Sequence, residues 1–314
     1  ITFNSMKEIK FSIPNISKQD INLVSKIIKS GWLTHGKYTT LFEKEVKKFT
    51  KAKFAVSVSS GTAGLHISCL ASGFKRGDEV IVPAQTHTAT AHAVEYTGAT
   101  AIFADVEYPS GNISLKEIKK NVTKKTKGII LVHMAGYPCE MNSIIKFCKK
   151  RKIIILEDCA HALGTYYEGV HAGNFGISGS FSFYPTKQIT TGEGGIVITN
   201  NEKFYKKIKK LKAFGIDKDI KDRKKQGDYD VKSLGFNYRM TDFQAALGYC
   251  QMINYAKNLK SRHSIARTYI KNLSKTDKIT YMPHSNNSSF FVFQIFCKNR
   301  EKILKNLKKK NNWS

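Results

Sequence analysis

Five apolar runs separated by helix-like segments constrain the fold more than any other feature of the sequence. The runs are FAVSV (54–58), EVIVP (79–83), AIFADV (101–106), GIILVH (128–133) and KIIILED (152–158). Short apolar runs without polar alternation are typical of strands buried on both faces, and helices between them make the connections of a parallel sheet. The sequence therefore predicts an α/β fold in which helices sandwich a mostly parallel sheet.

Helix signals lie between these runs and after them. Ser17 and Asp20 have the spacing of a capping box, apolar residues then recur at helical spacing, and Gly31 follows as a stop signal. Further helices are predicted from residue 61 and near residues 88–96, 114–121, 141–151, 202–214 and 241–258. Beyond the five runs, strands are predicted over 178–184, 194–200 and FFVFQIFC (290–297). We divide the chain into an N-terminal arm (1–15), a large domain (16–248) and part of a small C-terminal α/β domain (249–314).

The charge of the chain is strongly positive, +28 from 52 basic and 24 acidic residues. Its lysines are spread over helix-like segments without a zinc-finger spacing or an RNA-binding signature. A solvated Lys-rich surface and an anionic substrate are therefore favoured, while a basic nucleic-acid-binding or regulatory protein stays an alternative. No apolar run reaches the roughly 18 residues of a membrane span, and no membrane or metal partner is expected. The six cysteines stand singly, which favours reduced thiols and a cytoplasmic location.

Three features supply the parts of a cofactor site. The turn SSGTA (59–63) joins a buried strand to a helix and offers backbone N–H groups to a phosphate, although an ordinary helix cap has the same sequence. Asp158 ends a buried strand, where a carboxylate usually caps a helix or has a cationic partner. Lys187 follows an apolar stretch; most lysines are surface residues, but a desolvated one has a lowered pKa and can form a Schiff base. Together the three suit pyridoxal phosphate.

Longer stretches of the sequence carry a family resemblance. SSGTAGLHISCLA (59–71), GDEVIVPAQTHTATAHAVEYTGA (77–99), EDCAHALGTYYEGVHAGNFG (157–176), GSFSFYPTKQITTGEGGIVIT (179–199) and LGFNYRMTDFQAALG (234–248) resemble the DegT/StrS family of sugar aminotransferases. The similarity covers roughly residues 8 to 300, and the runs follow the order of the family. It implies the type I pyridoxal-phosphate aminotransferase fold and a homodimer with shared active sites.

The resemblance also implies which residues meet the cofactor ring. Lys187 would be the catalytic residue that binds the cofactor covalently and later moves a proton. Asp158 would keep the pyridine nitrogen protonated, and His161 would lie near the ring hydroxyl. His87 takes the position where the family commonly places a stacking aromatic; a polar residue at a helix entry would equally explain it.

The cofactor phosphate would be bound at the turn between the first strand and its helix. The resemblance implies that Gly61, Thr62 and Ala63 form the cup, with backbone N–H groups of the last two as donors. The Ser182 hydroxyl would join them. Asn237 would reach the phosphate from the neighbouring subunit, so each active site would need a dimer.

Four residues are candidates for substrate contact. Trp32 and Thr34 match a family segment at the mouth of the site, although a packed turn is the simpler interpretation of WLTHG. Tyr184 and Arg239 are expected to border the substrate, where a guanidinium would bind a diphosphate or a donor carboxylate. A structural ion pair is an equally good interpretation of Arg239.

The implied activity is an aminotransferase that moves an amino group, by family habit from L-glutamate, to a ketone on a nucleotide-linked deoxysugar for polysaccharide or secondary-metabolite synthesis. A keto-cyclitol acceptor and a dehydratase with the same cofactor are the enzymatic alternatives. Lys187 favours transamination, because the dehydratase branch replaces this lysine. Family members usually continue further, so the chain is expected to be short at its C-terminus, and an inactive homologue that only dimerises stays an alternative.

Overall fold

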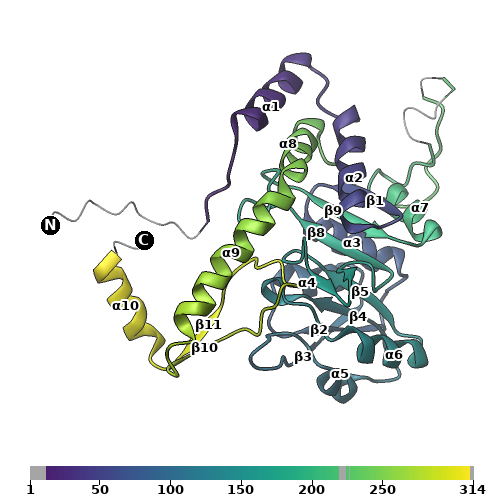
Figure 1. The fold of residues 1–314 in the computed structure, drawn as a ribbon. Coiled ribbons are helices and arrows are strands. Elements are labelled where there is room, and N and C mark those ends of the chain that lie inside the picture. Colours follow the sequence, from purple (N-terminus) through teal and green to yellow (C-terminus); the bar gives the residue numbers. More distant parts are fainter. Residues whose placement is uncertain (1–11, 219–223, 226, 312–314) are drawn as a thin grey trace.

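The computed structural model describes residues 12–218, 224–225 and 227–311. Most of the arm predicted over residues 1–15 lies outside this part of the chain. The described residues form a central sheet with helices on both faces, followed by a C-terminal segment that lies to one side (Figure 1).

The central sheet has seven strands in the order β1-β9-β8-β5-β4-β2-β3. These strands are β1 (Phe54–Val58), β2 (Glu79–Pro83), β3 (Thr100–Ala104), β4 (Thr126–Val132), β5 (Ile154–Asp158), β8 (Ser178–Ser182) and β9 (Gly195–Thr199). Neighbours from β3 through β8 pair in parallel, whereas β9 is antiparallel to both β1 and β8. Each of the five apolar runs is a strand of this sheet, which confirms the predicted mostly parallel α/β fold.

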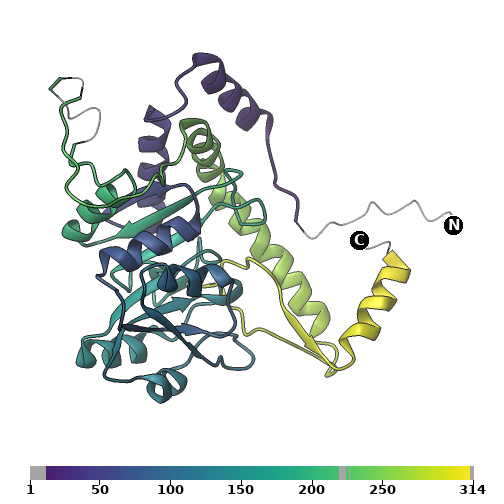
Figure 2. The ribbon, with the colours of Figure 1, turned by 180° about the vertical axis from the view of Figure 1, so that it is seen from behind.

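Helices cover both faces of the sheet, as a view from behind also shows (Figure 2). One face packs against α3 (Gly61–Ala71), α4 (Thr88–Glu95) and α7 (Glu202–Leu211). The other packs against α2 (Lys37–Thr50), α5 (Leu115–Asn121), α6 (Met141–Arg151) and α8 (Asp242–Ile253). α1 (Lys18–Ser30) lies on α8. Among the described residues, no helix has the length and apolar character that a membrane crossing requires.

The remaining elements are short, apart from one long helix. They are the 3-10 helix η1 (Met134–Gly136), the hairpin β6 (Tyr166–Tyr167) and β7 (Val170–His171), α9 (Tyr255–Leu273), the pair β10 (Ile279–Tyr281) and β11 (Ile295–Cys297), and α10 (Arg300–Asn311). Phe291, between β10 and β11, packs back toward the large sheet, where its ring stacks on that of His161.

Local signals in the sequence explain the ends of several helices. The capping box of α1 is present, with the Ser17 hydroxyl accepting from the backbone of Asp20, and Gly31 ends the helix with a left-handed φ of 70°. Ser60 caps α3 and His87 caps α4, each accepting a hydrogen bond from the first turn of its helix. These caps fix how the chain leaves β1 and β2 at the carboxyl edge of the sheet.

The side chains of Glu157 and Asp158, neighbours at the end of β5, lie on opposite faces of the sheet. Ile155 belongs to the core under α5 and α6, whereas Leu156 belongs to the core under α3 and α4. Because side chains alternate along a strand, Glu157 follows Ile155 and Asp158 follows Leu156. Asp158 therefore lies on the face that carries α3 and α4.

Three elements differ from the sequence expectation. The helix predicted over 241–258 is two helices, α8 and α9, because the chain turns at Asn254 and buries the whole side chain of Tyr255, whose hydroxyl donates to the Leu163 carbonyl. Of the strand predicted over 290–297 only β11 forms, because Phe290 has a left-handed φ of 47° and turns the chain. α2 was not predicted at all.

Candidate active site

Asp158 is the buried anion of the site, at the carboxyl end of β5. It stands in register with Val132 of β4 and Ser180 of β8. Its Oδ2 accepts from the Thr90 hydroxyl at 2.8 Å, and its Oδ1 accepts from the Ala160 backbone N–H at 3.1 Å. A buried carboxylate needs such donors, so α4 and the loop after β5 fix its orientation.

Lys187 is the cation that faces Asp158. It lies in the irregular chain after β8, where its backbone N–H donates to the Tyr184 carbonyl at 2.9 Å. Burial lowers the pKa of Lys187 from its ordinary value, and the negative charge of Asp158 acts in the opposite direction. The Lys187 amine is therefore more readily deprotonated than that of a surface lysine. It lies close enough to Asp158 for the carboxylate charge to affect its pKa.

An aromatic residue from the C-terminal segment covers this pair. The ring of Phe291 lies 4.7 Å from Nζ of Lys187 and stacks on the imidazole of His161 with ring centroids 4.2 Å apart. Burial, followed by the positive charges of Lys187 and His87, lowers the pKa of His161 to about 3. His161 is therefore neutral at physiological pH, and within the described chain its buried Nδ1 has no hydrogen-bond partner.

Hydrogen bonds fix the segment that carries Phe291. The N–H groups of Ser289 and Phe291 donate to the carbonyls of Gly136 and Ala135 in η1, each at 3.1 Å. The carbonyl of His161 accepts from the Ser289 hydroxyl at 2.7 Å and from the amide of Gln188, the residue after Lys187, at 2.6 Å. One polar network thus joins the C-terminal segment to the lysine and to His161.

The predicted phosphate cup lies where α3 approaches β8. The Ser60 hydroxyl accepts from the Ala63 N–H at 3.0 Å, so this amide already has a partner. A Cβ on Gly61 would lie only 2.8 Å from Cβ of Ser182, so glycine is what allows the helix to begin against β8. The first turn of α3, which contains Gly61, Thr62 and Ala63, thus begins against Ser182 of β8, and a phosphate-binding role for these residues stays a prediction.

The structure places His87 and Asn237 at the edge of this arrangement. His87 caps α4 through Nδ1, which accepts from the Ala89 N–H at 3.1 Å, and its charge still lowers the pKa of His161. Both the helix-entry interpretation and a position near the cofactor residues are thus compatible with the structure. Asn237 is exposed; its neighbour Tyr238 accepts from the Ser59 N–H at 2.8 Å, at the start of the cup.

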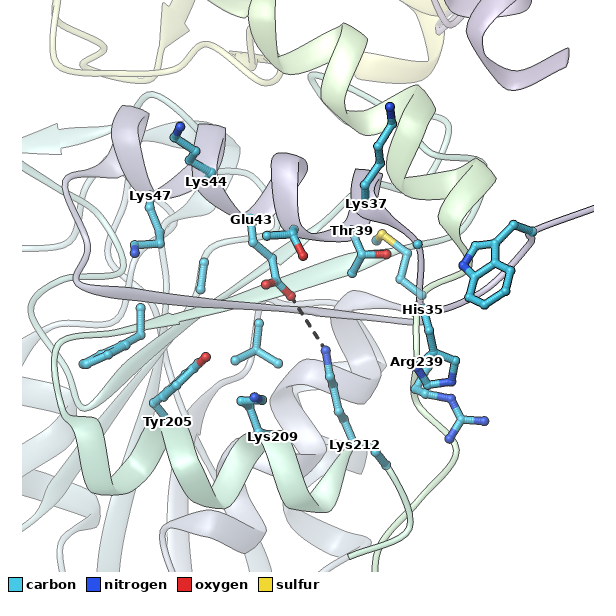
Figure 3. A pocket seen from close by; sticks show the side chains of 18 residues that line it. His35, Lys37, Thr39, Glu43, Lys44, Lys47, Tyr205, Lys209, Lys212 and Arg239 are labelled. Atoms are coloured by element: carbon cyan, nitrogen blue, oxygen red, sulfur yellow. Dashed lines mark ion pairs between the residues drawn. The ribbon is translucent and has the colours of Figure 1, made fainter. Parts of the chain in front are cut away.

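The four candidate substrate residues do not gather around Lys187 within one chain. Tyr184 and Thr34 are exposed. Trp32 and Arg239 line a different pocket, of about 700 Å³, between α2 and α7, and Lys187 is not among the residues that line it (Figure 3). Arg239 stacks over Phe214 at 4.9 Å rather than entering one of the described ion pairs.

A second buried cluster, His133, Glu157 and Cys159, has atoms close enough to hold a metal ion. Its hydrogen bonds give it another role. Nδ1 of His133 accepts from the Cys139 N–H at 3.1 Å, so the ring proton sits on Nε2 and is donated to Glu157 at 3.0 Å.

Glu157 also accepts backbone N–H bonds from the loop between β7 and β8, at 2.7 to 2.8 Å. The donors are Gly173, Phe175 and Gly176. With every carboxylate oxygen and both ring nitrogens engaged, we interpret the cluster as a clamp on that loop.

Sequence reasoning missed two residues that touch the site. Thr90 lies in α4, a helix of small residues. No local sequence pattern indicates that its hydroxyl donates to Asp158 at the end of a distant strand. Phe291 lies in an apolar run that resembles a strand, and only its packing against His161 reveals its position.

Comparison with known proteins places this geometry in context. Residues 14–312 match the DegT/DnrJ/EryC1/StrS aminotransferase family. GDP-perosamine synthase of Escherichia coli O157:H7 is 37% identical over 270 residues, which cover 86% of this chain and 72% of that protein.

Solved structures agree with the sequence match. Spr1654 of Streptococcus pneumoniae in its PMP form superposes with a TM-score of 0.90 at 29% identity, covering 96% of this chain and 83% of that one. A variant of GDP-4-keto-6-deoxymannose-3-dehydratase (ColD) with bound GDP-perosamine gives a TM-score of 0.89 at 26% identity, with the same two coverages, 96% and 83%.

Proposed function

The chain belongs to the DegT/DnrJ/EryC1/StrS aminotransferase family, and on that premise we propose that it transfers an amino group from L-glutamate to a keto group of a nucleotide-linked deoxysugar, with pyridoxal phosphate as cofactor. One observation carries this proposal: a lysine whose pKa burial lowers faces a buried carboxylate on the same side of the sheet as a glycine-containing helix start.

The residues present fit this cofactor. Asp158 offers a buried anion for a ring N–H, Lys187 an amine for an aldehyde, and the start of α3 backbone N–H groups for a phosphate. Buried polar atoms without a described partner, Nδ1 of His161 and Oγ of Ser180, lie around the same strand ends. When bound, pyridoxal phosphate supplies the carbonyl that is exchanged for an amine and a ring that accepts electrons.

The chain's own residues prepare the site for this chemistry. Burial keeps a larger share of the Lys187 amine neutral, and only a neutral amine is a nucleophile or can accept a proton at Nζ. Asp158 is fixed by Thr90 and Ala160 and would bind the protonated ring nitrogen of the cofactor. The Phe291 ring, stacked on His161, lies over the Lys187 amine and reduces its exposure to water.

Several observations support a nucleotide-linked sugar as the acceptor. The relative GDP-perosamine synthase and the ColD variant with bound GDP-perosamine are both named for GDP-linked sugars. The net charge of +28 would attract the diphosphate of such a molecule. Lys187 favours transamination over dehydration, because the resemblance implies that family dehydratases replace this lysine.

We propose a homodimer in which Asn237 of one chain completes the phosphate site of the other. Asn237 is exposed in a single chain, and the segment before it presents Leu234 with 83% of its surface exposed. The proposal places these two exposed side chains in the contact between the two chains. Five buried free thiols suit a reducing compartment, and we place the protein in the cytoplasm.

The test is a reaction with ¹⁵N-labelled L-glutamate, pyridoxal phosphate and GDP-4-keto-6-deoxymannose. The proposal predicts that 2-oxoglutarate forms in step with a ¹⁵N-labelled GDP-sugar, detected by mass spectrometry. Loss of a sugar hydroxyl with no label in the sugar would show dehydration instead. In a parallel reaction with a keto-cyclitol as acceptor, labelling of the cyclitol but not of the sugar nucleotide would move the acceptor to the cyclitol class.

A further inference from the structure

The chain between β10 and β11 returns to the central sheet, where it covers Lys187 (Figure 1). Two residues with a left-handed backbone meet there, because the Phe291 N–H donates to the Ala135 carbonyl at 3.1 Å. They are Ala135 in η1, with a φ of 54°, and Phe290, with a φ of 47°. Residues other than glycine adopt this conformation at a cost in free energy, and they keep it only where the surrounding contacts hold them in it.

Helix α9 supplies hydrogen bonds that hold this strained segment. Nη1 of Arg262 donates to the carbonyls of Phe290 and Phe291, at 3.2 and 3.3 Å. Nε2 of the next residue, His263, lies 3.0 Å from the Ser288 carbonyl, and because a carbonyl only accepts, this nitrogen carries the ring proton. Three of the four carbonyls from 288 to 291 are thus bound by two neighbouring side chains of one helix.

The chemistry of arginine suits this arrangement. Nη1 of a guanidinium carries two hydrogens in a fixed plane, so one nitrogen can donate to two neighbouring carbonyls. Hydrogen bonds from a charged donor are also stronger than those between neutral groups. Arg262 therefore fixes the direction of both carbonyls as well as their distance from α9.

Stability alone does not explain an arginine at position 262. The side chain is partly buried, and burial lowers the pKa of Arg262 from its ordinary value. None of the ion pairs in the described chain includes Arg262, so no carboxylate compensates for the loss of water around its charge. A cation in such surroundings destabilises the fold unless its hydrogen bonds compensate, and both of these go to the segment that carries Phe291.

We propose that Arg262 is a positioning residue for Lys187. Its bonds to the carbonyls of Phe290 and Phe291 hold the backbone of this segment in place. The Phe291 ring then lies 4.7 Å from Nζ of Lys187 and reduces the exposure of the amine to water. Arg262 is not among the causes that shift the pKa of Lys187, which are burial and the charge of Asp158. It therefore acts on the amine through the Phe291 ring and not by direct repulsion.

The positioning role rests on the proposed function for its meaning in catalysis, because Lys187 is the residue that would bind the cofactor. Its physical content is the ionisation of one amine, which can be measured without cofactor or substrate. An active aminotransferase in which Arg262 has no effect on Lys187 would overturn the positioning role alone. A chain without transferase activity in which Arg262 does affect Lys187 would overturn only the proposed function.

The other charged groups around Lys187 do not depend on Arg262. Asp158 lies at the end of β5, His161 in the loop after it, and His87 at the cap of α4. His161 is neutral wherever a lysine titrates, because its pKa is about 3. A change in the ionisation of Lys187 in an Arg262 variant therefore reports the burial of the amine.

The test is the pH dependence of labelling of Lys187 by an acetylating reagent in the full chain without cofactor, followed by peptide mass spectrometry. Arg262→Met keeps an apolar stem and removes both hydrogen bonds, so the midpoint of the labelling curve should rise by roughly 0.5 pH units or more as water reaches the amine. Arg267→Met removes the same charge from an exposed position of the same helix, and it should leave the midpoint unchanged.

A double variant tests the route through Phe291. Arg262→Met with Phe291→Ala should have the same midpoint as Phe291→Ala alone, because the second change removes the ring through which Arg262 acts. Shifts that add would overturn the inference, and so would an unchanged midpoint in Arg262→Met. Arg262→Lys keeps the charge without the fixed pair of donors and is the milder variant if Arg262→Met does not fold. It should give a smaller rise in the same direction, and no rise would again overturn the inference.

Discussion

The ring of Phe291 lies almost parallel to the imidazole of His161, with the two planes inclined by 12° and the centroids 4.2 Å apart. The same ring lies 4.7 Å from Nζ of Lys187. A residue from the chain beyond α9 therefore closes over a lysine that follows β8. This contact makes the C-terminal segment part of the site and gives Phe291 a positioning role toward Lys187.

Replacing Phe291 should change the ionisation of Lys187. In Phe291→Ala water reaches the amine, so the pKa of Lys187 should rise toward its ordinary value of 10.5. Phe291→Leu keeps the burial and removes only the π face that favours the charged amine, so the pKa should stay low or fall further. The measurement is the pH dependence of labelling of Lys187 by an amine reagent, followed by peptide mass spectrometry.

Phe293→Ala is the matched control, because Phe293 stacks on Tyr269 with centroids 5.1 Å apart and does not contact Lys187 in the described structure. This variant should not shift the pH dependence of Lys187 labelling. Identical shifts in the two alanine variants would mean that Phe291 has no specific part in burying the amine.

Thr90→Val should destabilise the protein by removing a donor from a buried carboxylate. Asp158 would keep only the Ala160 N–H, and loss of a hydrogen bond to a charged group costs about 1.5 to 3 kcal/mol. Urea unfolding measures the change. Thr268→Val, which removes an exposed hydroxyl bonded to the Ser264 carbonyl on α9, should cost far less, and equal costs would contradict the role given to Thr90.

Stability should fall with pH below about 6.5, in part because of His161. The pKa of His161 in the folded protein is about 3, below the ordinary 6.5. Between these two values the unfolded chain binds a proton at this histidine and the folded chain does not. The histidine's contribution is complete above pH 6.5 and is lost as the pH falls toward 3, with a slope of up to about 1.4 kcal/mol per pH unit.

The measurement for this prediction is the free energy of unfolding in urea at several values between pH 7 and pH 4. Asn does not titrate, so in His161→Asn the free energy of unfolding should depend less steeply on pH over this range. The difference in slope is the contribution of His161. Parallel curves for the natural protein and the variant would contradict the assignment. His171 and His284, whose pKa values burial lowers to about 4, should account for part of the remaining slope.

Glu157→Gln should destabilise the fold strongly without any metal dependence. The carboxylate binds four donors, and an amide cannot accept from all of them, so the loss should be about 3 kcal/mol or more. Thermal unfolding with and without EDTA measures both parts of the prediction. A clear loss of stability of the natural protein on adding EDTA would show that the cluster holds a metal instead.

Much of the fold could be predicted because its strands are buried on both faces. An apolar run such as GIILVH (128–133) between helices has few other structures available, and β4 forms there, over Thr126–Val132. The sequence-based prediction failed for elements whose formation depends on tertiary packing. α2 carries Tyr38, Phe42 and Val46 at helical spacing, but its many lysines hide that stripe. The break between α8 and α9 depends on the distant carbonyl of Leu163, which no local pattern indicates.

The candidate site could be predicted as far as its residues belong to the strand ends. Asp158 and the Ser60 cap follow from chain position, because parallel strands end at one edge of the sheet. Contacts that cross between distant segments could not be predicted. Thr90 reaches Asp158 from another helix, and Phe291 reaches Lys187 from far along the chain. The place of Asn237 in a second subunit stays a prediction.

The visible absorption spectrum of the protein with pyridoxal phosphate, before and after L-glutamate, tests the central claim most directly. A band should appear on mixing in the natural protein and in Lys146→Ala, and glutamate should bleach it, because the proposed function requires Lys187 to bind the cofactor and to release it to the donor. Lys187→Ala should give neither a covalent band nor repeated turnover with glutamate. A natural protein without the band, or a Lys187→Ala protein that still turns over, would contradict the account.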